Sequence, residues 1–146
     1  LGGIAYASSA TVSLAFRRDR VGDPLDGFGF VVPFVERRGI LACTYSSVKY
    51  PGRAPADRVL LRTFVGGALQ ESLALLDDDA LVALVRRELR ELLGIEAAPE
   101  FVDIHRHRRA MPQYRVGHLD RLRRIDDRLA ALPGLCAAQR EAVERA

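Results

Sequence analysis

Alternating hydrophobic and polar positions dominate the first half of the chain. Val12, Leu14 and Phe16 alternate with Thr11, Ser13 and Ala15. The same two-residue period recurs in three further segments, at residues 27–32, 40–46 and 59–65. A period of two places alternate side chains on opposite faces of a strand. The pattern therefore predicts four strands before residue 67.

Polar segments that contain glycine and proline separate these strands. Arg17–Asp26 contains Gly22 and Pro24, and we interpret it as a hairpin loop. A second polar segment, residues 49–55, is also predicted to be a loop because it contains two prolines and a glycine. Short connections between successive strands favour an antiparallel sheet.

Helical periodicity replaces the alternation in the second half. Leucines and a valine recur every three or four residues over 81–93, after the acidic segment Asp77–Asp79 and before Gly94. These are the features of an amphipathic helix with an acidic N-terminal turn and a glycine at its C-terminus. A second apolar stripe covers residues 116–132, and residues 99–107 alternate again as a fifth strand.

This order of elements predicts an α+β fold. We expect a mostly antiparallel sheet of about five strands with two amphipathic helices on one face. Residues 1–135 are expected to form one domain, and residues 136–146 a divergent tail on the surface.

Composition supports a folded domain and gives no strong indication of nucleic-acid binding. The chain has 146 residues, of which 49% are hydrophobic and 28% charged, and no apolar run approaches the roughly 18 residues of a membrane span. A net charge of +3 is too small to demand a nucleic-acid partner. The arginines between 106 and 124 are expected to be solvated or to form ion pairs with Asp77–Asp79. A basic nucleic-acid-binding domain remains a less favoured hypothesis.

Three residues of the fifth strand carry the main candidate for metal chemistry. Asp103, His105 and His107 are two residues apart and share one strand face. A site of two histidines and one carboxylate is conceivable there, but no third histidine lies nearby. We therefore interpret this face as polar or cleft-lining and predict no bound metal.

Nucleophilic and phosphate-binding motifs are not found in the sequence. Cys43 and Cys136 are far apart in apolar surroundings and are predicted to be buried thiols. Ser46 and Ser47 lack the flanking glycines of a nucleophile elbow. The segment Gly27–Gly29 lacks the third glycine of a dinucleotide fingerprint.

Six segments in order resemble one enzyme family. They are Ile4–Ser8, Gly27–Pro33, Ile40–Ser47, Pro51–Pro55, Leu60–Gly67 and Ala110–Leu119. Together they resemble oxygen-dependent protoporphyrinogen oxidase, of the flavin amine-oxidase superfamily. The resemblance covers about residues 1–135 and corresponds to the C-terminal third of that family.

The resemblance implies a flavoenzyme of haem biosynthesis. Members of the family bind FAD and use oxygen to oxidise protoporphyrinogen IX to protoporphyrin IX. Residues 1–135 would be part of the substrate-binding domain of such an oxidase. The resemblance also implies a cytoplasmic protein, and it leaves open peripheral membrane association and homodimer formation by the parent protein.

The resemblance also implies five site residues. Val31, Thr44 and Phe64 match positions on the substrate cavity, and Met111 matches a cavity position near the flavin. His107 matches a ring residue that touches the flavin and is often tryptophan in bacterial members. The resemblance leaves the catalytic residues unknown, and no metal is expected.

Three parts of the family pattern are missing from the sequence. The glycine fingerprint for FAD and the arginine with which the family engages a substrate carboxylate are absent. After residue 135 the chain reads Cys136–Arg140 where the family continues with a strand and a glycine-rich turn. We therefore expect a truncated piece of the parent, which alone neither holds FAD tightly nor turns over. The alternative is a stand-alone module that binds a porphyrin-like ligand without catalysis.

Overall fold

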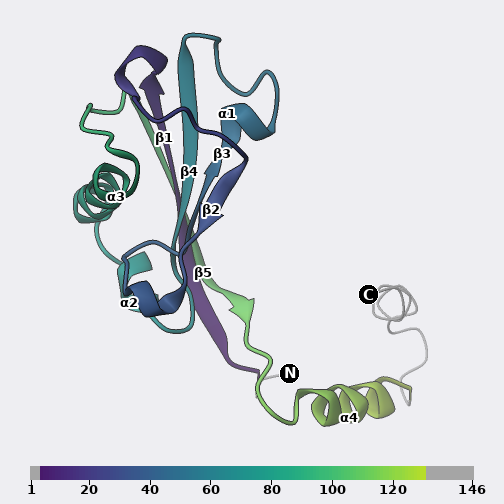
Figure 1. The fold of residues 1–146 in the computed structure, drawn as a ribbon. Coiled ribbons are helices and arrows are strands. Elements are labelled where there is room, and N and C mark those ends of the chain that lie inside the picture. Colours follow the sequence, from purple (N-terminus) through teal and green to yellow (C-terminus); the bar gives the residue numbers. More distant parts are fainter. Residues whose placement is uncertain (1–3, 131–146) are drawn as a thin grey trace. The chain divides into compact units, whose positions relative to one another are not determined.

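The computed structural model describes residues 4–130 and confirms the α+β fold (Figure 1). The five strands are β1 (Tyr6–Arg17), β2 (Gly29–Val31), β3 (Ala42–Tyr45), β4 (Arg58–Gly66) and β5 (Phe101–Pro112). The α-helices are α1 (Ser46–Lys49), α2 (Glu71–Ala74), α3 (Asp78–Leu93) and α4 (His118–Ala130), and two 3-10 turns are η1 (Arg18–Arg20) and η2 (Phe34–Glu36). The sheet has the order β2-β3-β4-β1-β5, with every neighbouring pair antiparallel.

The chain divides into two compact units. One is Tyr6–Pro112, which contains the whole sheet with α1, α2 and α3. The other comprises Leu1–Ala5 and Gln113–Ala146, of which the structure describes residues 4–5 and 113–130, including α4. Within residues 4–130, no helix has the length and apolar character needed to cross a bilayer. The predicted boundary at residue 135 and the predicted tail lie outside the described residues.

Strand β1 lies between the two strands β4 and β5 and organises the core. Its even-numbered residues from Ala10 to Phe16 are at most 1% exposed. They belong to one hydrophobic cluster with Leu81, Val85 and Leu89 of α3. Helix α3 lies along that side of the sheet (Figure 1). The alternation of β1 and the periodicity of α3 are therefore complementary, as the sequence predicts.

Both ends of α3 are capped as expected. The side chain of Asp77 accepts a hydrogen bond from the Ala80 amide at 2.8 Å. At the other end, Gly94 has a φ of 65°, and its amide donates to the carbonyl of Arg90. A left-handed residue at this position closes a helix without the steric penalty of a side chain.

A buried carboxylate fixes α3 to the segment before β3. Glu88 is 4% exposed, and its Oε1 accepts a hydrogen bond from the Gly39 amide at 2.9 Å. The guanidinium of Arg38 lies 3.5 Å from Glu88 and also binds Glu91. Because a buried charge needs such partners, this group specifies how the segment docks on the helix.

The predicted hairpin at Arg17–Asp26 is wrong. β1 pairs with β4 and β5, whereas β2 pairs with β3 at the edge of the sheet. The connection between β1 and β2 therefore runs from the fourth strand of the sheet order to the first, past β4 and β3. Alternation gives the faces of a strand but does not name its partners, which explains the error. The four-residue helices α1 and α2 were not predicted because one turn carries no periodic signal.

Gly66 marks a close approach of β4, β1 and α2. Its φ is 96°, and a Cβ added there would lie 2.6 Å from Ala74 Cβ and 2.9 Å from the Ser8 carbonyl oxygen. Gly52 also has a positive φ, of 81°, but an added Cβ would meet no atom within 4 Å. Substitutions at both glycines would strain the backbone, but only a substitution at Gly66 would also cause a steric clash. Comparing the two positions therefore separates these effects.

We expect Gly66→Ala to lower the free energy of unfolding by about 3 kcal/mol or more, because it combines overpacking with a strained φ. The matched control Gly52→Ala should lose about 1 kcal/mol from strain alone. Urea unfolding of the two variants measures both values. Equal losses would contradict the close approach at Gly66.

Candidate functional site

The candidate site is the sheet face that bears the odd-numbered residues of β1 from Ser9 to Ser13, which we call the open face. Residues paired across an antiparallel ladder point to the same side. Three in-register rows therefore share this face. They are Val31–Ala42–Phe64–Thr11–His105, Gly29–Thr44–Arg62–Ser13–Asp103 and Gly66–Ser9–His107.

Four of the five residues predicted to form the site lie on the open face. Val31 and Phe64 share one row, Thr44 lies in the next row, and His107 lies in the row beyond Phe64. Val31 is 78% exposed although it is apolar. Thr44 and Phe64 are half-buried. The structure therefore brings together residues from β2, β3, β4 and β5, which the sequence separates by up to 76 positions (Val31 to His107).

Met111 lies beyond an irregularity in β5. Ser9 pairs with His107 and Ala7 pairs with Met111. Between these two pairs the chain advances four positions along β5 but only two along β1. Within this bulge Arg109 has a φ of 47°, and its amide donates to the Ser8 hydroxyl at 3.0 Å. Bulges change the direction in which later side chains point. Met111 is therefore not in continuous register with His107.

A carboxylate stabilises the β1 side of this bulge. The Ser8 amide donates to Oε1 of Glu71 at 2.7 Å, and hydrogen bonding from Ser8 lowers the pKa of Glu71. The Ser8 carbonyl accepts a hydrogen bond from the Gly67 amide at 2.9 Å. Helix α2, which carries Glu71, thereby fixes the backbone opposite the bulge.

The polar end of the open face includes the histidines that the sequence analysis considered as metal ligands. Register confirms that Asp103, His105 and His107 share a face. His105 Nε2 lies 3.4 Å from Asp103 Oδ2. Within residues 4–130, however, no three His, Cys, Asp or Glu side chains are grouped so that they could hold a metal ion.

Cys43 faces the core and has no nucleophilic character. It is 1% exposed and pairs with the buried Thr63, on the face opposite the candidate site. Burial raises the pKa of its thiol from 9.0 to about 12. Because only the thiolate attacks, the buried thiol is inert near neutral pH. Cys136 lies outside the described residues.

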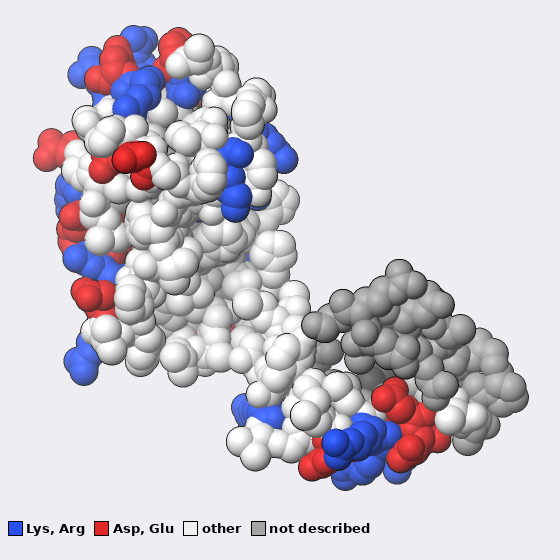
Figure 2. All heavy atoms as spheres, turned by 45° about the vertical axis from the view of Figure 1, so that its right-hand side comes forward, with Lys and Arg blue, Asp and Glu red and all other residues white. Residues whose placement is uncertain are grey.

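Charged side chains gather away from the middle of the visible surface. On the larger unit in Figure 2 they lie mainly at the upper end and along the left edge, beside a broad uncharged area, and a further charged group lies on the smaller unit. Arg106 pairs with Asp78 at 2.6 Å and also donates to the Leu76 carbonyl. The expected meeting of this arginine with the acidic segment 77–79 is therefore confirmed.

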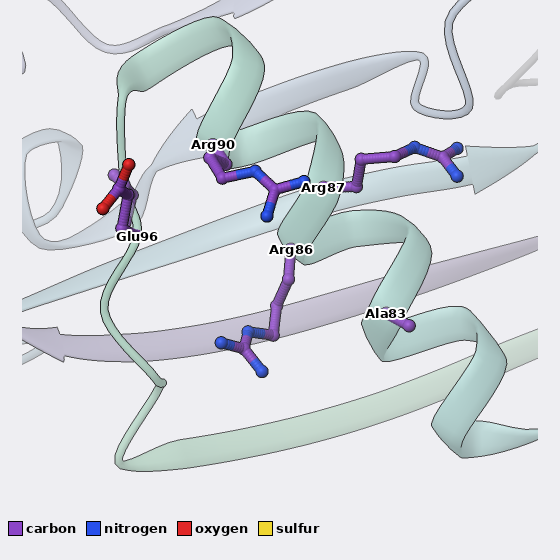
Figure 3. Close-up of a pocket in the computed structure, with 6 residues that line it drawn as sticks. Ala83, Arg86, Arg87, Arg90 and Glu96 are labelled. Carbon is purple, nitrogen blue, oxygen red and sulfur yellow. The ribbon is translucent and has the colours of Figure 1, made fainter.

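A shallow hollow beside α3 does not form a second candidate site. Its lining includes Arg86, Arg87, Arg90 and Glu96. Figure 3 shows that the guanidinium groups of Arg86 and Arg87 point in different directions. Because α3 covers the core side of the sheet, this hollow is separate from the open face.

Comparisons with known proteins identify a family for most of the chain. The model of the flavin-containing amine oxidoreductases matches residues 1–138. The coproporphyrinogen III oxidase of Staphylococcus aureus is 38% identical over 116 residues, which are 80% of this chain and 25% of that protein. Protoporphyrinogen oxidase 2 of Arabidopsis thaliana is 33% identical over 134 residues, 90% of this chain and 26% of that protein.

Solved structures agree with this fold. A crystal structure from Exiguobacterium sp. 255-15, assigned as a protoporphyrinogen oxidase, matches with a TM-score of 0.79 and 34% identity. The match covers 91% of this chain and 29% of that one. The chain thus spans about a quarter of the length of the curated relatives it matches.

The burial of Cys43 predicts slow labelling and a defined pH dependence. In a Cys136→Ser variant, a thiol reagent at pH 8 should modify Cys43 only as fast as the chain unfolds. The stabilisation from keeping this thiol neutral is complete below pH 9 and is lost as the pH rises from 9.0 toward about 12, because only the unfolded thiol ionises there. Rapid labelling of the native chain would contradict this placement.

Proposed function

The chain belongs to the family of flavin-containing amine oxidoreductases, and from that premise we propose that it supplies a substrate-binding wall of a porphyrinogen oxidase. The observation that carries this proposal is the open face. It gathers Val31, Thr44, Phe64 and His107 on one side of a sheet whose other side forms the core.

The side chains of the open face suit a large flat ligand. The ring of Phe64 offers an aromatic surface to a macrocycle, and the small branched side chains of Val31 and Thr44 leave room for it. His107 is the proposed contact to the flavin ring, and Met111 the proposed cavity residue near the flavin. In this role the chain binds and orients the substrate, while the flavin supplies the redox chemistry.

Two porphyrinogens are candidates for the substrate. The sequence resemblance favours protoporphyrinogen IX, which would be oxidised to protoporphyrin IX with oxygen as the final acceptor. Coproporphyrinogen III is the second candidate, because relatives that are 38% and 36% identical carry that name. We also propose that the parent protein is cytoplasmic. Peripheral contact with the membrane and formation of a homodimer remain alternatives for the parent protein.

The described residues do not fit the phosphate groups of FAD. The first turn of α3 follows Asp77 and contains Asp78 and Asp79, whose negative charges oppose a pyrophosphate. The glycine pair before α2 is also unsuitable, because the Gly67 amide already bonds the Ser8 carbonyl. We infer that FAD is held by other parts of the parent protein and that this chain alone is inactive.

Flavin content tests this division. The parent protein should purify with about one flavin per chain and should oxidise a porphyrinogen, as followed by the fluorescence of the porphyrin product. The chain of residues 1–146 alone should show neither property. A stoichiometric flavin spectrum from this chain alone would refute the proposal, whereas porphyrin binding without flavin would support the stand-alone module.

Phe64 tests the proposed wall. In the parent protein, Phe64→Ala should raise KM for the porphyrinogen about threefold to tenfold, because stacking on the macrocycle is lost. Tyr50→Ala removes an exposed aromatic ring next to α1 and should leave KM unchanged. Steady-state kinetics on both variants compares them. An equal effect of the two substitutions would remove Phe64 from the cavity.

A further inference from the structure

The geometry points to Arg62 as a substrate-binding residue that selects a porphyrinogen with a carboxylate above the middle of the open face. This inference rests on the proposed function and deepens it. It favours coproporphyrinogen III over protoporphyrinogen IX as the substrate.

Arg62 lies within the group of residues assigned to the cavity. It pairs with Thr44 on one side and with Ser13 on the other, so its side chain belongs to the open face. Phe64 is two positions further along the same strand and therefore on the same face. The Arg62 side chain is exposed, and its Nε donates to the Ser13 hydroxyl at 3.4 Å.

Three other arginines on the strands or at their ends have carboxylate partners. Arg17 binds Asp19, Arg58 binds Glu100, and Arg106 binds Asp78. Among residues 4–130, Arg62 forms no ion pair, and its one recorded side-chain bond is the long contact to a hydroxyl.

The nearest carboxylate in the same row is engaged elsewhere. Asp103 is separated from Arg62 by β1, because both residues pair with Ser13 from opposite sides. Its carboxylate lies 3.4 Å from His105. A guanidinium has five N–H donors in a planar fork, so Arg62 retains donors for an incoming carboxylate in a two-point contact.

The two candidate substrates differ in the group that such an arginine recognises. Coproporphyrinogen III carries four propionate side chains, whereas protoporphyrinogen IX carries two propionates and two vinyl groups. When a macrocycle stacks on Phe64, its rim reaches the neighbouring row that contains Arg62. A vinyl group there would leave the guanidinium desolvated and unpaired, which disfavours binding. A propionate would satisfy it.

Kinetics on the full-length parent protein test this inference. Arg62→Gln should raise KM for coproporphyrinogen III about tenfold or more while kcat stays near the wild-type value, because the lost contact is a charge-assisted hydrogen bond. KM for protoporphyrinogen IX should change less than threefold. Arg62→Lys should recover part of the loss, since it keeps the charge but not the planar fork. Arg86→Gln, on the outer side of α3, is the matched control and should change neither KM.

Binding titrations separate this inference from the proposed function. Wild-type parent protein should bind coproporphyrin III more tightly than protoporphyrin IX, and Arg62→Gln should remove the difference. If the wild type shows this preference but oxidises neither porphyrinogen, the proposed function fails and the role of Arg62 stands. If Arg62→Gln weakens both porphyrins equally, or neither, the inference about Arg62 is overturned even in an active oxidase.

Discussion

The pairing of β1 with β4 on one side and β5 on the other determines both surfaces of the sheet. It sends the even-numbered residues Ala10–Phe16 toward α3 and the odd-numbered residues to the open face. A shift of one residue would exchange the two sets. The open face therefore depends on the burial of Val12 and Leu14, which excludes a one-residue shift of the register.

The two faces obey different constraints. The core face must be apolar and closely packed, and the buried carboxylate of Glu88 on α3 is held by the Gly39 amide and Arg38. The open face combines Phe64 and Val31 with hydroxyl, imidazole and guanidinium groups. Such a mixture would be costly in a core, because each polar group would need a partner. In the proposed role, the same mixture would give an amphipathic macrocycle an aromatic platform and polar contacts at its rim.

Sequence patterns predicted the parts of this structure that depend on local periodicity. The five strands, the caps of α3 at Asp77 and Gly94, and the shared face of Asp103 and His107 are confirmed. Features that depend on tertiary pairing were missed. The edge position of β2 depends on which strands occupy both sides of β1, and the displacement of Met111 depends on a bulge that Ser8 stabilises from another strand. The role proposed for Arg62 was not predicted, because an arginine in an alternating strand looks like an ordinary solvent-facing residue.

Independence of the two faces is also consistent with the specificity role proposed for Arg62. Arg62 contributes little to folding, because its recorded side-chain bond is a 3.4 Å contact with Ser13 on an exposed surface. Its replacement leaves Leu61 and Thr63, which point into the core from the same strand, in place. Single substitutions on the open face can therefore change the contacts proposed for the rim of a macrocycle. The residues on the core face meanwhile keep the strand register that positions Phe64.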